Sequence, residues 1–180
     1  MYKSYCVCIP TAGLGTRLEK FTKNLNKSLI DLNNTPIISH IINKFPKNTD
    51  FVIPLGYKGN LVRNYLKLAH PDSNFFFSKV KNFSGKNSGL GLSLINSQKY
   101  LQRPFIFISC DTLVKGKILI KNKNWVGYSN SKTNENYRKI KIDKKKFVKF
   151  FAEKKDRDKS LKNYIGLAEI KDFKNFWDVM

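Results

Sequence analysis

The chain predicts an α/β fold in which helices cover both faces of a mixed, mainly parallel central sheet. Three observations predict it. Short apolar runs alternate with amphipathic segments from residue 5 onward, the pattern typical of successive β-α units. The run 104–110 is the most strongly apolar, which suits a strand at the sheet centre. The chain has 180 residues, 41% of them apolar, enough for one full hydrophobic core, so we expect a single domain over residues 1–180.

The first half of the chain supplies most of the β-α units. Residues 5–10 are expected to form the first strand. Thr35-Pro36 is expected to open a helix, with a capping hydroxyl and proline at the first helical position, and this helix should end near Phe45-Pro46. Its expected buried stripe is Ile37, Ile38, Ile41 and Ile42. The other expected elements are strands over 51–55 and 75–80 and helices over 60–69 and 88–101.

The second half looks different. The strand 104–110 ends at Asp111-Thr112, and shorter strands are expected over 125–129, 137–142, 147–152 and 164–170, before a helix over 172–180. The run Lys144-Lys145-Lys146 falls between two of these strands, which indicates a hairpin turn. The chain stops inside this last amphipathic segment, so a natural terminus and a truncated fragment both remain open.

The net charge of +21, with a pI near 9.9, raises nucleic-acid binding as a possibility. The lysines, however, are spread from Lys3 to Lys174 among abundant asparagine and isoleucine, and charge alone speaks to solubility and non-specific binding. We therefore expect no nucleic-acid partner, although a basic nucleic-acid-associated protein stays as an alternative.

The sequence shows neither an apolar run long enough to span a membrane nor the pattern of a signal peptide. No apolar run approaches the roughly 18 residues that cross a bilayer, and the N-terminus lacks the order of a signal peptide. We expect a cytoplasmic protein without a membrane partner. Cys6, Cys8 and Cys110 lie in apolar runs, so three buried thiols and no disulfide are expected.

The first thirty residues hold the most informative motif, a phosphate-handling loop. Thr11, Ala12, Gly13, Leu14, Gly15 and Thr16 follow the first predicted strand, then come Arg17 and, ten positions later, Lys27. Two glycines after a strand let the backbone turn tightly and aim N–H groups at an anion, while the arginine and the lysine supply positive charge. The loop is neither a Walker A loop nor a dinucleotide fingerprint, because Leu18 replaces the third glycine. The ligand implied is the phosphate chain of a nucleotide.

With these residues the chain resembles the sugar-phosphate nucleotidylyltransferases. That family opens with Gly-x-Gly-Thr-Arg-Leu, followed by Thr, by Pro-Lys-x-Leu and by a Pro before a helix; this chain has the first motif at 13–18, then Thr22, Lys27-Ser28-Leu29 and Pro36. Asn26 stands where the family has proline, and we expect this change to loosen the loop. The resemblance implies a Rossmann-like three-layer α/β/α nucleotidyltransferase (GT-A-like) fold.

The resemblance continues downstream over nearly the whole chain. Ser88-Gly89 sits where the family places a glycine-containing segment that faces the nucleobase, and Asp111 where it places a metal-binding aspartate. Glu153-Lys154 is similar to the start of the family's Glu-Lys-Pro motif, which implies that Glu153 bonds acceptor hydroxyls and Lys154 meets the acceptor phosphate. Tyr137-Arg138 replaces the Tyr-Gly of many sugar enzymes, which puts contact with a pyranose there in doubt.

The activity implied is transfer of a nucleotidyl group from a nucleoside triphosphate to a phosphorylated sugar, polyol or small alcohol, with release of pyrophosphate, for surface polysaccharide assembly. Mg²⁺ takes one or two carboxylates plus phosphate oxygens, which suits Asp111 as its ligand. In this interpretation Arg17 stabilises the leaving pyrophosphate and Lys27 the α-phosphate. Whether the protein forms a homo-oligomer stays open.

One expected residue has no counterpart. The family's second metal-binding aspartate comes well after the Glu-Lys motif, and Asp172 and Asp178 come too early to match it. A truncated chain is the preferred explanation. A catalytically inactive nucleotide-binding or regulatory relative is the alternative that this gap leaves open.

Overall fold

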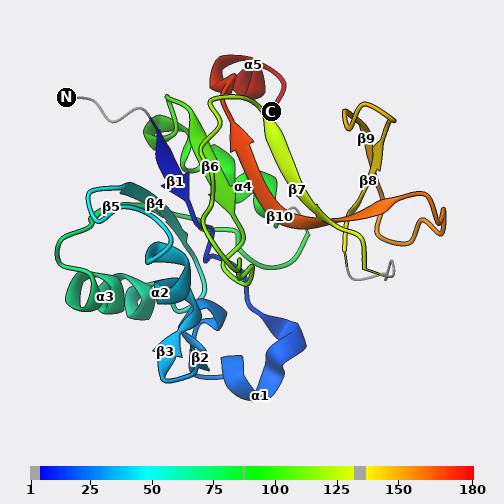
Figure 1. Cartoon of the computed structure of the whole chain (residues 1–180). Helices are drawn as coiled ribbons and strands as arrows, with labels where there is room; N and C mark the ends of the chain where they lie inside the picture. Colours follow the sequence, from blue (N-terminus) through cyan, green and yellow to red (C-terminus); the bar gives the residue numbers. More distant parts are fainter. Residues whose placement is uncertain (1–4, 87, 132–136) are drawn as a thin grey trace.

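The computed structural model describes residues 5–86, 88–131 and 137–180, and its centre is an eight-stranded mixed sheet (Figure 1). The strand order is β5-β4-β1-β6-β10-β8-β9, with β7 pairing to β10. Strands β5 (Asn74–Lys79), β4 (Asp50–Leu55), β1 (Cys6–Cys8) and β6 (Phe105–Ile108) run parallel. The expected mixed sheet is confirmed, and β6 lies near its middle, as its apolar sequence predicted.

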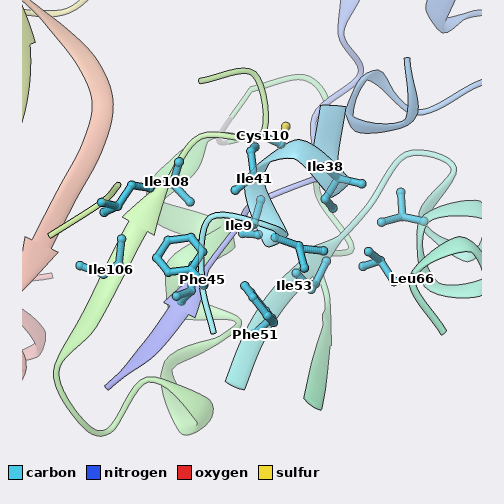
Figure 2. Packing of buried hydrophobic residues seen from close by; sticks show 14 of the residues in the cluster. Ile9, Ile38, Ile41, Phe45, Phe51, Ile53, Leu66, Ile106, Ile108 and Cys110 are labelled. Carbon is cyan, nitrogen blue, oxygen red and sulfur yellow. The ribbon is translucent and has the colours of Figure 1, made fainter. Parts of the chain in front are cut away.

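One face of the sheet is covered by two helices, α2 (Ile37–Ile42) and α3 (Gly59–Ala69). Figure 2 shows the buried core on this side, in which Ile38 and Ile41 of α2 meet the strand residues Phe51, Ile53 and Ile106. Val62 and Leu66 of α3 are wholly buried in the same cluster. The helical spacing of these apolar residues therefore fixes which side of each helix faces the sheet.

The opposite face packs against α4 (Leu90–Ile95) and the C-terminal α5 (Phe173–Asp178). Cys6, Cys8, Phe105 and Phe107 point to this side, since successive residues of a strand alternate between faces. The aromatic side chains of α5 lie over them, with Phe176 in edge-to-face contact with Phe105. Helices thus cover both faces, which confirms the expected three-layer α/β/α architecture. All three cysteines are buried free thiols.

The other half of the sheet is antiparallel. The long strand β10 (Lys162–Ile170) pairs with β6, β7 (Trp125–Ser129) and β8 (Lys139–Ile142), and β8 pairs with β9 (Val148–Ala152). The hairpin turn expected at Lys144-Lys145-Lys146 is confirmed, because the Asp143 N–H bonds to the Phe147 carbonyl and Lys146 takes a positive φ. None of the helices in the described ranges is both long and apolar enough to cross a bilayer.

Two local predictions are wrong. Thr35 does not cap a helix: β2 (Asp31–Leu32) pairs with β3 (Thr35–Pro36) in a small hairpin, and Pro36 precedes α2 without a side-chain cap bond. Asn33 and Asn34 both take positive φ in the turn, as a type I′ hairpin requires. The helix expected over 88–101 is shorter than predicted, because α4 begins at Leu90 and ends at Ile95, followed by a 3₁₀ turn over Gln98–Tyr100.

The directions of the strands determine where the predicted site residues gather. The loops that follow β1, β4, β5 and β6 leave the same edge of the sheet, since these four strands are parallel. β10 runs antiparallel to β6, so its beginning lies at this edge as well, as do the start of β8 and the end of β9. We call it the carboxyl edge. It carries the loop after β1, Gly56, Ser88-Gly89, Asp111 and Glu153-Lys154.

Candidate functional site

The glycine loop starts directly after β1 and turns twice before it reaches Lys27. Gly13 is exposed, and a Cβ added there would meet no other part of the chain within 4 Å, whereas Gly15 takes a φ of +71°. A side chain on Gly15 would come within 2.9 Å of Thr22 and 3.1 Å of the Lys27 side chain. The glycine therefore lets the turn approach the stem of the lysine closely. Beyond it, Thr16 and Arg17 form an exposed 3₁₀ turn that leads into α1 (Glu19–Thr22).

Asn26 does not loosen this loop, and the sequence-based expectation is wrong. Its side chain is wholly buried, and its Nδ2 donates to the carbonyl oxygens of Thr11 at 2.8 Å and Tyr57 at 2.6 Å. Its Oδ1 accepts from the N–H and the hydroxyl of Ser28. A proline here would offer none of these bonds. The amide joins three separate stretches of chain and fixes the position of the adjacent Lys27.

Tyr57 and Gly56 support the loop from the end of β4, and sequence reasoning missed both. The Tyr57 hydroxyl donates to the carbonyl oxygens of Thr22 and Lys23, and the Tyr57 N–H donates to the carbonyl of Ala12. A Cβ on Gly56 would lie 2.5 Å from the Ala12 carbonyl oxygen, so only glycine permits this approach. A Gly-Tyr pair after a buried strand was the available signal, since glycine in such a place marks close backbone contact.

Asp111 meets the glycine loop across the carboxyl edge. Its Oδ2 lies 2.9 Å from the Lys27 Nζ, although the two residues are 84 positions apart in the sequence. Burial lowers the pKa of Lys27, but the neighbouring Cys110 and Asp111 raise it and prevail over the nearby charge of Arg17, so the net shift is upward. Lys27 is therefore a cation throughout the physiological pH range. The structure brings the predicted phosphate lysine and the predicted metal ligand together.

The position of Asp111 is set by β10. The Ser109 N–H donates to the Gly166 carbonyl at 2.8 Å, and the Thr112 hydroxyl donates to the Ile165 carbonyl at 2.6 Å. Gly166 has a φ of +71°, and a Cβ there would lie 2.3 Å from the Ser109 hydroxyl. These contacts hold the segment on both sides of Asp111. Burial raises the pKa of the adjacent Cys110 thiol to about 11, so it remains protonated beside the site.

Some of the remaining nucleotide-binding candidates are buried and hold the loop in place, whereas others are exposed to solvent and accessible to a ligand. Thr11 is wholly buried, and its hydroxyl and N–H both donate to the Pro54 carbonyl. Ala12 is buried as well, so these two residues hold the loop rather than present side chains to a ligand. Leu14 and Gly15 are half-buried, and Ser88 and Gly89 are exposed, with the Ser88 hydroxyl bonded to the Gly85 carbonyl.

The predicted acceptor residues lie at the same edge, but within the described part of the chain no hydrogen bond or ion pair joins them to the nucleotide residues. Glu153 follows β9 and is 77% exposed, with its carboxylate 3.5 Å from the Arg138 guanidinium. Lys154 is exposed. Arg138 is thus paired with the Glu153 carboxylate, the group that the resemblance assigns to binding acceptor hydroxyls. This half of the site is open and weakly ordered by side-chain contacts.

Asp111 fits a Mg²⁺ ligand, because it is a half-exposed carboxylate at the end of a central strand. Within the described ranges, no group of three or more metal-binding side chains forms around it. Asp172 accepts a bond from Asn124 and follows Ile170, which pairs with Phe105 at the start of β6. Asp172 therefore lies at the opposite edge of the sheet from Asp111.

Comparison with known proteins agrees with this architecture. No protein-family model matches the chain. It is similar to the bifunctional protein GlmU of Methanococcus maripaludis, with 24% identity over 158 residues, and to that of Methanocaldococcus jannaschii, with 27% identity over 152 residues. The alignments cover 86% and 83% of this chain, but only 37% and 36% of the relatives. The chain thus spans little more than a third of the length of the curated relatives it matches.

Solved structures match over almost the whole chain. A putative glucose-1-phosphate thymidylyltransferase from Bacillus anthracis superimposes with a TM-score of 0.76 at 17% identity, over 98% of this chain and 76% of that one. The CTP:phosphocholine cytidylyltransferase LicC from Streptococcus pneumoniae gives a TM-score of 0.67 at 18% identity, over 94% and 72%. The chain therefore has the fold of the nucleotidyltransferases, and its resemblance to the sugar-phosphate nucleotidylyltransferases is confirmed.

Proposed function

We propose that the chain is a nucleotidylyltransferase domain, which transfers a nucleotidyl group from a nucleoside triphosphate to a phosphorylated sugar, polyol or small alcohol and releases pyrophosphate. The observation that carries the proposal is the meeting of Lys27 and Asp111 beside the Gly15 turn. A cation and a carboxylate, brought together from distant parts of the chain, lie at the carboxyl edge of parallel strands, which is where open α/β sheets bind ligands.

The proposed reaction requires the protein mainly to position the two substrates and to neutralise the negative charge of their phosphate groups. The second pKa of a phosphate monoester is about 6, so the acceptor is largely a dianion at neutral pH and needs no general base. Its oxygen attacks the α-phosphorus, the bond from that phosphorus to the bridging oxygen breaks, and pyrophosphate leaves with the electron pair. Lys27 neutralises the charge that develops on the α-phosphoryl oxygens, and Arg17, exposed on the loop, neutralises the leaving group.

The acceptor is held by the other half of the site in this proposal. Lys154 binds its phosphate, and Glu153 accepts hydrogen bonds from its hydroxyl groups. Bound Mg²⁺ would supply charge neutralisation at the phosphate oxygens, with Asp111 as its protein ligand.

The names of the similar proteins support this acceptor class. They include a glucose-1-phosphate thymidylyltransferase and a phosphocholine cytidylyltransferase, so the same fold serves both a sugar phosphate and a phosphorylated small alcohol. We place the product in the supply of activated precursors for surface polysaccharide, made in the cytoplasm.

A catalytically inactive nucleotide-binding relative is the second candidate. The observation that favours it is the lack of a second metal-binding aspartate beside Asp111 in the described part of the chain, because Asp172 lies at the other edge of the sheet. Such a protein would bind a nucleoside triphosphate through the same loop without releasing pyrophosphate.

Pyrophosphate release separates the two candidates. The protein would be incubated with each nucleoside triphosphate and a panel of phosphorylated sugars, polyols and alcohols, with Mg²⁺ and with a chelator. We expect release with one pair of substrates, loss of it with the chelator, and a fall of roughly 100-fold or more in Lys27→Met, Arg17→Ala and Asp111→Asn. Lys20→Met and Asp72→Asn are matched controls, since both side chains are exposed, and both should keep full turnover.

Nucleotide binding without turnover for every pair would instead establish the inactive relative. Binding of RNA or duplex DNA that weakens steeply with salt and survives Asp111→Asn would establish the basic nucleic-acid-associated protein. Full turnover in Lys27→Met or Asp111→Asn would refute the site assignment.

A further inference from the structure

The β8–β9 hairpin carries a group of apolar side chains that remain exposed, although one of them, Phe151, also packs edge-to-face on Tyr164. It projects at the end of the sheet in Figure 1. Phe147 is 66% exposed and Phe150 52%, while Val148 and Phe151 are also exposed. Isolated exposed apolar residues are ordinary, but four within five consecutive positions form a patch that indicates an interaction site. We call these four residues, with the turn lysines Lys144, Lys145 and Lys146, the hairpin tip.

The apolar side chains occupy both faces of the hairpin. Val148 pairs with Ile142 and Phe151 with Ile140, so these side chains share one face, while Phe150 pairs with Lys141 on the other. The ladder shifts register between Lys141 and Ile142, which leaves Lys149 at a bulge. A partner that binds one face of the hairpin would leave the apolar side chains of the other face exposed to water. A medium into which the whole tip inserts would cover the side chains of both faces.

The charge of the hairpin tip is strongly positive. Three consecutive lysines form the turn, and Lys149 adds a fourth cation close by. The acid of the turn, Asp143, accepts a hydrogen bond from the Phe147 N–H and lies 3.6 Å from Lys149, so it is already engaged. Lysines that flank exposed aromatic side chains match the boundary of an anionic bilayer, where phosphate groups lie above the acyl chains.

A second copy of the chain fits this surface poorly. Two chains that each carry +21 repel each other, and pairing through the edge strand β9 would bring two lysine-rich tips together. The bulge at Lys149 is a feature that protects sheet edges against such pairing.

We propose that the hairpin tip docks the protein on an anionic membrane surface. Phe147, Phe150 and Val148 enter the boundary between headgroups and acyl chains, and the turn lysines bind lipid phosphates. The expectation of no membrane partner rested on the lack of a spanning segment, which a peripheral contact does not need. Lys139 at the start of β8 pairs with Ala152 at the end of β9, so the turn lies at the far end of the hairpin from Glu153-Lys154.

Vesicle flotation tests the proposal directly. The full chain would be floated with vesicles of phosphatidylcholine alone or of phosphatidylcholine with phosphatidylglycerol. We expect binding to the anionic vesicles only, and weaker binding as salt is raised. The triple variant Lys144→Gln/Lys145→Gln/Lys146→Gln should lose roughly 100-fold in partitioning. Phe147→Ser/Phe150→Ser should lose roughly tenfold, with circular dichroism confirming that both variants fold.

Matched controls come from the far side of the molecule. Lys44→Gln/Lys47→Gln/Lys67→Gln removes the same charge from exposed positions after α2 and on α3, and Leu68→Ser removes an apolar side chain that is 83% exposed. Both should bind vesicles like the parent chain. Equal losses in the hairpin and control triple variants would show that only net charge matters, and would overturn the proposal. So would a lack of vesicle binding combined with single-stranded RNA binding that needs Phe150, or with sedimentation as a dimer that Phe147→Ser/Phe150→Ser abolishes.

Discussion

The two halves of the candidate site differ in how completely the chain builds them. On the nucleotide side, Asn26 is wholly buried with four hydrogen bonds, and Lys27 meets Asp111 at 2.9 Å. On the acceptor side, Glu153 is largely exposed, and its ion pair with Arg138 spans 3.5 Å. The first half is held by bonds between distant segments and the second by a solvated pair on an edge hairpin.

Under the proposed function, this contrast gives the two halves different roles in binding the two substrates. A preformed set of charges needs no reorganisation when the triphosphate arrives, which is the condition for strong electrostatic stabilisation of the reaction. An open acceptor half must be ordered by its own ligand, and that ordering reduces affinity. Substitutions on the nucleotide side should therefore affect both stability and turnover, and those on the acceptor side only the use of the acceptor.

Gly166→Ala should have the largest effect on stability. The new Cβ would lie 2.3 Å from the Ser109 hydroxyl in a backbone conformation with a φ of +71°, so clash and strain add. We expect a loss of about 2–4 kcal/mol in the free energy of unfolding, together with a fall in turnover, because Ser109 and Thr112 flank Asp111. Gly116→Ala is the matched control, since its φ is +81° but a Cβ there would meet no other part of the chain within 4 Å. Urea unfolding should show a loss of only about 1 kcal/mol there, and equal losses in the two variants would contradict the packing argument.

Asn26→Ala should follow, because it leaves the buried carbonyl of Thr11 without its amide donor. Unsatisfied buried groups cost about 1–3 kcal/mol, and we expect a loss in that range. The KM for the triphosphate should rise as well, since Lys27 is the next residue. Asn124→Ala provides the comparison: that side chain also makes several bonds, to Asp172 and to the Lys171 N–H, but at the opposite edge of the sheet. It should lower stability without changing KM for the triphosphate.

The case of Asn26 shows where sequence reasoning reached its limit. Apolar runs predicted β1, β4, β5 and β6 within one or two residues, because burial of such runs is decided locally by composition and length. The partners of Asn26 are Thr11 and Tyr57, 15 and 31 positions away, and no local pattern reveals them. The glycine loop could be predicted because its residues are consecutive in the sequence. The hydrogen bonds of Asn26 and Tyr57 that hold the loop could not, because they join distant segments.

The secondary-structure errors have the same origin. Thr35-Pro36 has the composition of a helix start, but pairing with Asp31–Leu32 across two asparagines of positive φ prevailed over that local preference. An Asn-Asn turn between short strands was the signal that would have identified the hairpin. Glu153-Lys154 was placed by resemblance alone, and its pairing with Arg138 depends on the register of β8 and β9, which the sequence does not encode locally.

Tyr57→Phe removes only a hydroxyl and should have a smaller effect. That hydroxyl donates to the carbonyl oxygens of Thr22 and Lys23, which close the far end of the glycine loop. We expect a loss of about 1 kcal/mol in stability and a severalfold rise in KM for the triphosphate, with KM for the acceptor unchanged. Tyr65→Phe is the control, because its hydroxyl bonds to Ser39 on the helical layer, away from the loop. A rise in KM for the triphosphate in both variants would show that the effect is global.

Arg138→Ala should have the smallest effect on stability and the most selective effect on catalysis. Exposed ion pairs contribute about 0–1 kcal/mol, so the midpoint of thermal unfolding should change by no more than about 4 °C. Under the proposed function, the Arg138 guanidinium competes with the acceptor hydroxyls for the Glu153 carboxylate. Its removal should therefore lower KM for the acceptor severalfold and leave KM for the triphosphate unchanged, whereas Glu153→Gln should raise KM for the acceptor.

The opposite result for Arg138→Ala would be equally informative about the open half of the site. A rise in acceptor KM would mean that Arg138 itself binds the acceptor's phosphate, beside Lys154, and that its pairing with Glu153 holds this cation near the site until the substrate arrives. Initial rates over a range of acceptor concentrations, at saturating triphosphate, distinguish the two. In either case the acceptor half is completed by its ligand, because its charges are exposed and only loosely paired. Equal changes in both KM values would mean instead that the two halves form a single rigid unit.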